Sequence, residues 1–503
     1  MARGGGIRER AEGLFGTPSR FMQPRLVLII TTFALVAFGL LMIYSSSSIV
    51  DMASEDFNND AAYHLKRQLG FVAAGGIAAI VLAISDYHLW SRSLLPVVWV
   101  ATVGLLLLVF TGLAGREAYG ATRWIDIGPF NLQPSEFAKI TIVLVAAYLG
   151  SRCFEEYSMG YEGLATFSII GLGLPLVLIV LQPDKGTTII CAATIFAMAY
   201  LAGVPRSWLA VGFGIGVAGV LLLAFKDEYS RSRVFAAVNP WNDPYGAGYQ
   251  LIQGFYAFSC GGLFGVGVGL SGQKYSYLPM AYNDFIFPVI GEELGLVGTL
   301  GVVLGFCLLV WAGLQIARYA PDLSGRLVAG GCTIMLLIQF LVNVGGVLGM
   351  IPLTGKPLPF LSYGGSSIVS CLLLVGFVAS VSLHSALPET AYERSRRSFS
   401  TEGGEVNSFR DEYALVGEAT PRSARPAGST SGFSVVSGSG ARVGTSVQPG
   451  RADDTSVEGI RASRAFSEAH SSGRVTTDAS GRRRIDLGPS ASDRLRSSRG
   501  KSN

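Results

Sequence analysis

The sequence predicts an all-α polytopic membrane protein of about ten transmembrane helices, followed by a disordered C-terminal tail. Half of the 503 residues are hydrophobic, and the mean hydropathy is +0.44. Only 15% of the residues are charged, against about 25% in soluble domains. Apolar runs close to the ~20 residues that cross a bilayer recur along the first 386 residues. They occupy residues 25–47, 68–86, 93–112, 134–150, 165–181, 187–204, 207–225, 285–314, 327–350 and 365–386.

These runs divide the chain into a short N-terminal segment (1–24), an apolar domain (25–386) and a tail (387–503). The tail is rich in Ser, Gly and Arg and poor in large apolar residues, so it cannot bury enough surface to fold alone. It carries 18 of the 39 basic and 14 of the 35 acidic residues, and therefore the whole net charge of +4. A solvated linker is the simpler interpretation of this tail. Binding to anionic lipid or to an acidic partner is the alternative.

The expected topology places both termini in the cytoplasm. An even number of spans puts the termini on one side, and the Arg-rich segment 1–24 identifies that side. The longest outer loop, 226–284, has an aromatic and Gly content that favours an ordered, partly re-entrant element. Several cations fall in outer loops, against the usual charge rule, which favours an anionic extracellular ligand. They are Arg116, Arg123, Lys185, Arg231, Arg233, Lys274 and Lys356.

Two polar motifs lie at the start of predicted spans on the outer face. Arg123 precedes a span on which Glu136 and Lys139, three residues apart, share one helix face. Those two side chains can bind substrate, or they can simply neutralise each other. Asp184 and Lys185 place one acid and one base in a tight turn between two spans.

Two further motifs carry the most informative residues. Asp284 stands at the mouth of a long apolar run, where a carboxylate costs several kcal/mol unless it is paired, hydrated or used. Lys356 and Ser366 belong to the segment 352–367, whose Gly-Gly-Ser-Ser opens the last span as a helix N-terminus suited to anions. The six cysteines and four histidines are dispersed, so the sequence predicts no metal site.

In combination, these motifs resemble the SEDS family (shape, elongation, division and sporulation), the RodA, FtsW and SpoVE glycosyltransferases. The resemblance covers about residues 25–386. It is carried by 123–139, 182–187, 239–250, 277–295 and 352–367. It implies a ten-helix fold that polymerises lipid II at the outer face of the cytoplasmic membrane, with the essential acid at Asp284.

The resemblance also implies a substrate-binding set and two departures from the family pattern. Family polar residues fall on Arg123, Glu136, Lys139 and Asp184. Many division members have Pro-Glu-Ala-His-Thr where this chain has residues 279–283, Pro-Met-Ala-Tyr-Asn. The usual Gln-Pro-Asp-Leu-Gly-Thr has Lys185 in place of Leu, which adds a cation near the expected diphosphate.

The expected chemistry needs a base for the acceptor hydroxyl and cations for a lipid diphosphate. Desolvation at a membrane interface raises the pKa of a carboxylate, which suits Asp284 to the role of general base. The planar guanidinium of Arg123 suits the diphosphate, and Lys185, Lys356 and Ser366 complete the substrate-binding set. A divalent cation, Mg²⁺ or Mn²⁺, can share that task, although no ligand cluster identifies one.

We interpret the sequence as a peptidoglycan glycosyltransferase of the division branch, at the septum of a bacterial cytoplasmic membrane. The long tail and the end of the first span, Tyr44–Ser47, favour division over elongation. The expected partners are lipid II, a class B penicillin-binding transpeptidase, other divisome proteins and membrane lipids, with no nucleic acid. An elongation-type polymerase, a lipid II flippase or other transporter, and a non-catalytic transpeptidase scaffold are the alternatives.

Overall fold

The computed structural model describes most of the chain up to Ser385 and two short strands near its C-terminus. The described residues are 19–55, 59–111, 115–118, 121–127, 130–275, 277–385, 474–477 and 483–486. Most of the predicted N-terminal segment and of the predicted disordered tail therefore lies outside the described residues. The chain divides into two units, Met1–Glu405 and Val406–Asn503. In the second unit, β4 (Arg474–Thr477) pairs antiparallel with β5 (Arg483–Asp486).

The predicted polytopic helical architecture is confirmed. Nine helical stretches among the described residues are long and apolar enough to cross a membrane. A shorter tenth, α4 (Leu95–Leu108), is extended by a 3₁₀ turn to Thr111. The nine are α2 (Ser19–Ala53), α3 (Tyr63–Ile84), α5 (Pro134–Phe154), α6–α7 (Tyr161–Leu181), α8 (Lys185–Ala202), α9 (Arg206–Phe225), α12 (Ile286–Tyr319), α13 (Leu323–Val347) and α14 (Gly365–His384).

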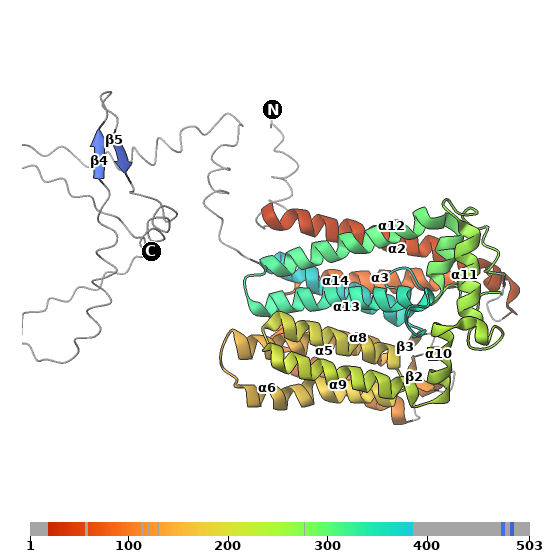
Figure 1. Cartoon of the computed structure of the whole chain (residues 1–503), viewed down its shortest axis with the longest axis horizontal. Helices are drawn as coiled ribbons and strands as arrows, with labels where there is room; N and C mark the ends of the chain where they lie inside the picture. The colour runs from red at the N-terminus through yellow and green to blue at the C-terminus, as the bar shows by residue number, and fades with distance from the viewer. Residues whose placement is uncertain are drawn as a thin grey trace, which may run out of the picture. The chain divides into compact units, whose positions relative to one another are not determined.

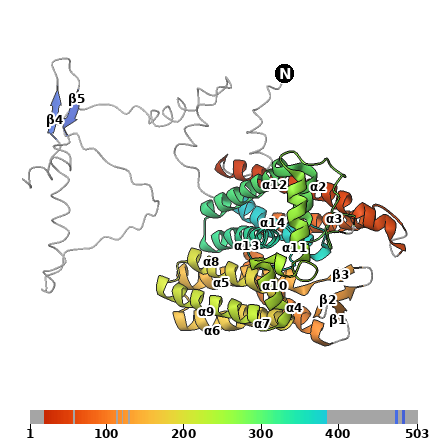
Figure 2. The same ribbon diagram turned by 45° about the vertical axis from the view of Figure 1, so that its right-hand side comes forward.

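The helices form two groups that run side by side (Figures 1 and 2). One group contains α2, α3, α12, α13 and α14, and the other contains α4 to α9. The two groups meet where α13 packs against α5 and α8. Within the first group α3 and α14 approach closely, because a Cβ at Gly376 would lie 2.8 Å from the carbonyl oxygen of Ala79.

A small β-sheet lies between α4 and α5 in the sequence and was not predicted. Its strands β1 (Gly115–Ala118), β2 (Ala121–Ile127) and β3 (Phe130–Leu132) pair antiparallel in that order. The run Ala-Thr-Arg-Trp-Ile-Asp-Ile of β2 is rich in β-branched and aromatic residues, which favour strands. The sheet lies at the same end of the bundle as α10 (Glu228–Val238) and α11 (Tyr249–Gly261) (Figure 2).

The predicted outer loop 226–284 contains ordered helices. After α10 and a 3₁₀ turn (Pro240–Asn242), α11 crosses the end of the bundle and packs against α12 (Figure 1). The crossing is close, because a Cβ at Gly261 would lie 1.9 Å from the carbonyl oxygen of Gly291. The segment therefore closes the end of the bundle at which α12 begins.

The Gly-rich stretch after α11 supplies hydrogen-bond partners to backbone groups at a break in α12. Gly295 adopts φ 66° and ψ −160° inside that helix, which interrupts its hydrogen-bond ladder. Val266 N donates to the carbonyl oxygen of Glu292 at 2.9 Å, and Leu296 N donates to that of Gly262 at 3.0 Å. The part of α12 beyond the break, residues 296–319, is about 36 Å long and is enough by itself to span a bilayer core of about 30 Å.

Candidate active site

Asp284 lies two residues before α12, which begins at Ile286. Its partly buried side chain opens into a small hollow that also contains residues of α13 and of the loop before α14. The loop comes close because Gly355 adopts φ 66°, and a Cβ there would lie 3.7 Å from Asp284 Oδ2. The other residues that line the hollow are Val342, Asn343, Gly346, Val347, Leu353, Thr354 and Lys356.

Asn343 of α13 fixes the backbone on both sides of this hollow. Its Nδ2 donates to the carbonyl oxygen of Asp284 at 2.9 Å and to that of Lys356 at 2.7 Å. Its Oδ1 is buried and has no hydrogen-bond partner among the described residues. Because buried polar atoms normally have a partner, this oxygen marks a place that a polar ligand group can fill. Sequence reasoning missed Asn343, although an amide inside the apolar run 327–350 was a signal.

Among the residues that the structure describes, the Asp284 carboxylate has no salt-bridge partner. In the described part of the chain, no other side chain donates a hydrogen bond to it. Burial raises its pKa to about 6, against the opposing effects of its own backbone N–H and of the Arg233 charge. A carboxylate with this pKa is largely ionised at neutral pH and can accept a proton from a nearby hydroxyl.

Asp184 has the opposite surroundings. Its side chain is buried, and Oδ2 accepts hydrogen bonds from four other side chains, while Oδ1 caps α8 by accepting from Thr187 N at 3.2 Å. Burial disfavours its charge, but the Lys356 ammonium and the other donors outweigh burial and hold its pKa well below the ordinary value. The donors to Oδ2 are Gln133 Nε2 (3.0 Å), Ser135 Oγ (2.8 Å), Thr187 Oγ1 (2.9 Å) and Lys356 Nζ (2.9 Å).

Glu136 and Lys139 form the buried ion pair that their spacing allowed, with Nζ and Oε2 2.6 Å apart. Lys139 also donates to Gln339 Oε1 at 2.7 Å, and Lys356 Nζ lies 3.7 Å from Glu136 Oε1. The structure therefore brings Glu136, Lys139, Asp184 and Lys356 into one network. Two carboxylates and two ammonium groups make it formally neutral, so it presents little net charge to an anionic substrate.

The two arginines near the site remain unneutralised. Arg123 donates to the carbonyl oxygens of Gln182 at 3.2 Å and Pro183 at 2.7 Å. Arg233 of α10 donates to the carbonyl oxygen of Leu353 at 2.8 Å. Among the described residues, neither guanidinium has a carboxylate within salt-bridge distance. Arg233 was noticed in the sequence as an outer-loop cation, but it was not predicted as a site residue.

The two remaining predicted site residues lie at the edges of the site. Lys185 Nζ is bound by Asp227 Oδ2 at 2.5 Å and by Ser230, so it ties α8 to the start of α10. Ser366 Oγ accepts from Gln133 N at 2.9 Å and donates to the carbonyl oxygen of Asn131. Ser366 therefore joins the start of α14 to the segment that enters α5.

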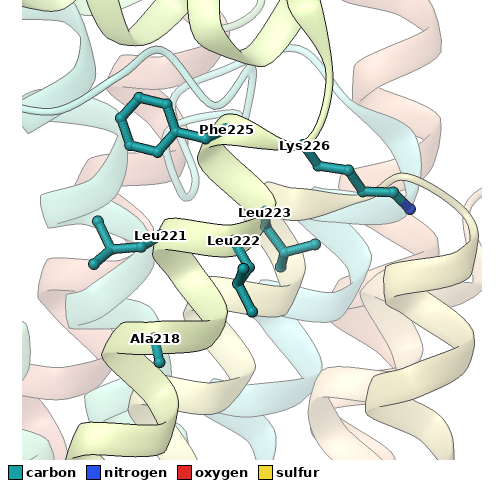
Figure 3. Close-up of a pocket in the computed structure, with 6 residues that line it drawn as sticks. All are labelled: Ala218, Leu221, Leu222, Leu223, Phe225 and Lys226. Atoms are coloured by element: carbon teal, nitrogen blue, oxygen red, sulfur yellow. The ribbon is translucent and has the colours of Figure 1, made fainter.

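A second hollow lies at the C-terminal end of α9 (Figure 3). It is lined by apolar side chains, and Lys226 is the one ionisable residue in its lining. A membrane-facing helix with apolar side chains in contact with lipid accounts for such a surface. The chemistry is therefore expected at Asp284. The other lining residues are Ala218, Leu221, Leu222, Leu223 and Phe225.

The donor set does not fit a divalent cation held by the protein alone. Asp284 is the one carboxylate among the residues that line its hollow, and the oxygens of Asp184 already accept from several donors. Among the described residues, no group of three or more His, Cys, Asp or Glu side chains is arranged to hold a metal ion. A metal at this site would need most of its ligands from substrate and water.

Sequence comparison places the chain in a family. A model of the FtsW/RodA/SpoVE family, described as cell cycle proteins, matches residues 25–387. The chain belongs to this family. A probable peptidoglycan glycosyltransferase FtsW of Trichlorobacter lovleyi is 39% identical over 365 residues, which cover 73% of this chain and 94% of that protein. Stage V sporulation protein E of Bacillus subtilis is 39% identical over 364 residues, covering 72% and 98%.

Solved structures of the family share the fold. A chain from a structure described as a peptidoglycan synthase complex that coordinates polymerization and crosslinking is 30% identical, with a TM-score of 0.57. That match covers 71% of this chain and 96% of the other. The rod shape determining protein RodA of Thermus thermophilus is 27% identical, with a TM-score of 0.52, and the match covers 72% and 97%.

Proposed function

We propose that this protein is a peptidoglycan glycosyltransferase that polymerises lipid II into glycan strands. The observation that carries the proposal is Asp284, which lies in a hollow at one end of a membrane bundle. Its carboxylate has a raised pKa and, within the described part of the chain, no cationic partner in direct contact. The names of the curated FtsW relatives support the same activity. The neutral network beside the hollow supports a site whose free positive charge comes from Arg123 and Arg233.

Asp284 acts as the general base in this proposal. It takes the proton of the acceptor sugar hydroxyl while that oxygen attacks the anomeric carbon of the donor sugar. The bond from that carbon to the diphosphate oxygen breaks, and the polyprenyl diphosphate leaves with the bonding electron pair. The pKa of about 6 keeps most of the carboxylate ionised at neutral pH, as a base requires.

Arg123 and Arg233 bind the leaving diphosphate in this proposal. Each uses part of its guanidinium on backbone carbonyls and keeps other N–H groups and its charge for an anion. Lys139 and Lys356 are buried and bound to carboxylates, so we assign them to the wall of the site. Lys185 and Ser366 fix neighbouring segments at its edge.

The active site faces the outside of the cytoplasmic membrane in this proposal, with both termini in the cytoplasm. The excess of Arg in residues 1–24 supports that orientation. Tyr245, near the site end, and Tyr157, in the loop after α5, are 93% and 83% exposed. In a cysteine-free background, a cysteine at 245 should react with an impermeant thiol reagent added outside cells, and one at 157 should not. The reverse pattern would invert the topology.

We assign the protein to septal synthesis with a class B penicillin-binding transpeptidase. Curated relatives named FtsW are 35–39% identical to this chain. A solved relative belongs to a complex that couples polymerization to crosslinking, which supports a transpeptidase partner. Depletion should give unseparated filaments, and the transpeptidase should copurify. Rounded cells would instead indicate the elongation role.

The deciding experiment supplies the purified full-length protein, in liposomes, with fluorescent lipid II. A ladder of glycan products that lysozyme degrades supports the polymerase. Transfer of labelled lipid between leaflets without product would indicate a flippase. Neither product nor transfer, in the presence of the copurified transpeptidase, would indicate a scaffold.

A further inference from the structure

A buried aspartate–histidine pair lies at the outer ends of α2 and α3. Asp51, in the last turn of α2, is fully buried, and His64, at the start of α3, is 5% exposed. His64 Nδ1 is hydrogen-bonded to Asp51 Oδ1, and the backbone N of His64 donates to Oδ2 at 3.2 Å. Ser47 Oγ donates to the same oxygen at 3.1 Å. Three donors therefore fix this carboxylate, which in turn fixes the plane of the imidazole.

The imidazole packs against two tyrosines from different loops. The centroid of the His64 ring lies 4.6 Å from that of Tyr282 and 4.6 Å from that of Tyr363. The two tyrosine rings are 5.9 Å apart in an edge-to-face arrangement. The backbone N of Tyr363 also donates to the carbonyl oxygen of Tyr282 at 2.9 Å. His64 thus sits where the two loops meet.

These two loops line the candidate active site together with α13. Tyr282 lies two residues before Asp284, and Tyr363 lies in the loop that carries Gly355 and Lys356. Neither loop has regular helix or strand structure around these residues, so their relative position depends on side-chain contacts and on the backbone hydrogen bond between Tyr363 and Tyr282. Gln68, one turn after His64 on α3, also contacts the loop that contains Tyr363. Its Oε1 accepts a hydrogen bond from Gly364 N at 3.3 Å.

We propose that Asp51 and His64 are positioning residues for glycosyl transfer, which hold the Asp284 loop against the Gly355–Lys356 loop through Tyr282 and Tyr363. The proposal rests on the polymerase function proposed above. Helices α2 and α3 are parts of the packed bundle, so the pair adds a second rigid support to a loop that Asn343 of α13 already holds at the Asp284 carbonyl. Misplacing a catalytic group by about 1 Å can cost on the order of 100-fold in rate.

The test compares His64→Gln with a matched control, His88→Gln. His88 follows the other end of α3, away from Asp284, and its Nδ1 lies 2.8 Å from Asp86 Oδ1. Unlike the buried His64–Asp51 pair, this pair is exposed, and His88 Nε2 also lies 3.4 Å from Asp322 Oδ2. Purified variants are assayed with fluorescent lipid II for kcat, KM and the midpoint of thermal unfolding. We expect His64→Gln to lower kcat about tenfold or more while KM stays within about threefold. His88→Gln should retain the wild-type values.

A double variant separates positioning from general loosening. If His64 acts through Tyr282, His64→Gln combined with Tyr282→Leu should be no slower than the slower single variant. Multiplicative losses, or a wild-type kcat for His64→Gln, would overturn the proposal. If His64→Gln does not fold, Tyr363→Leu leaves the Asp51–His64 pair intact and must show the same loss of kcat. Absence of product from the wild-type protein would instead count against the polymerase function itself.

Discussion

Asp184 and Asp284 both lie beside one short loop, Thr354–Lys356, but the hydrogen bonds and charges around their carboxylates differ. Asp184 accepts hydrogen bonds from four side chains, one of which is the ammonium of Lys356. Asp284 faces the backbone of Gly355 and has no side-chain donor among the described residues. The surroundings of Asp184 therefore favour its ionised form, whereas those of Asp284 allow its carboxylate to gain and lose a proton near neutral pH.

The difference shows that burial alone does not decide what a carboxylate does. Burial disfavours the charge of both aspartates, yet the pKa of Asp184 is well below its ordinary value and that of Asp284 rises to about 6. The partners decide the direction of the shift. Two acids whose surroundings push their pKa values apart are typical of a site in which one holds structure and the other transfers a proton.

The largest expected effect is on the rate, at Asp284. Asp284→Asn keeps the shape of the side chain and removes the base, so glycan polymerisation should fall about 10²- to 10⁴-fold. Insertion into the membrane and binding of the proposed transpeptidase partner should not change, because Asp284 has no salt bridge among the described residues to lose. The measurement is the rate of product formation from fluorescent lipid II. A variant that polymerises at nearly the wild-type rate would remove Asp284 from the mechanism.

The second expected effect is on stability, at Asp184. Asp184→Asn leaves the buried Lys356 ammonium without its closest carboxylate, and removing one partner of a buried pair costs about 3–5 kcal/mol. Glu136 Oε1, 3.7 Å from Lys356 Nζ, should moderate the loss toward the lower value. The midpoint of thermal unfolding in detergent should fall, and the double variant with Lys356→Met should recover part of it. An unchanged midpoint would mean that the pair does not stabilise the fold.

The smallest expected effects depend on pH and belong to Asp284. Because its base form is required, kcat/KM should rise with pH through an apparent pKa of about 6 and then level off.

The raised pKa of Asp284 also makes stability depend on pH. Between the ordinary pKa of an aspartate, 3.8, and about 6, the folded protein binds more protons than the unfolded chain, so stability should fall as pH rises through that window. At neutral pH, Asp284→Asn should therefore be more stable than the wild type, by roughly 1–3 kcal/mol.

A flat pH–rate profile between pH 5 and 7 would contradict the raised pKa. The stability comparison provides an independent check, since it needs no substrate. If Asp284→Asn lowers the unfolding midpoint as Asp184→Asn does, then Asp284 has a structural partner and the contrast between the two aspartates is lost.

The sequence by itself determined the class of fold and predicted a functional role for Asp284. Runs of about 20 apolar residues can be recognised in the local sequence. Inside a bilayer, a single segment can form all its backbone hydrogen bonds within itself only as a helix. The cost of a carboxylate at the start of the run 285–314 was likewise visible without a structure, and so was the i, i+3 spacing of Glu136 and Lys139.

Only the tertiary structure decided which charges meet. Lys356 binds Asp184, which lies 172 positions away in the sequence. Arg233 comes close enough to Asp284 to lower the pKa of its carboxyl group. The ring of His64 packs against those of Tyr282 and Tyr363. From the sequence, Arg123, Lys185 and Lys356 were predicted to bind substrate and Arg233 was not, yet in the structure Lys185 and Lys356 are paired with carboxylates whereas Arg123 and Arg233 have no carboxylate within salt-bridge distance among the described residues. Electrostatic energies depend on separation and on local desolvation. Both are set by how distant segments pack.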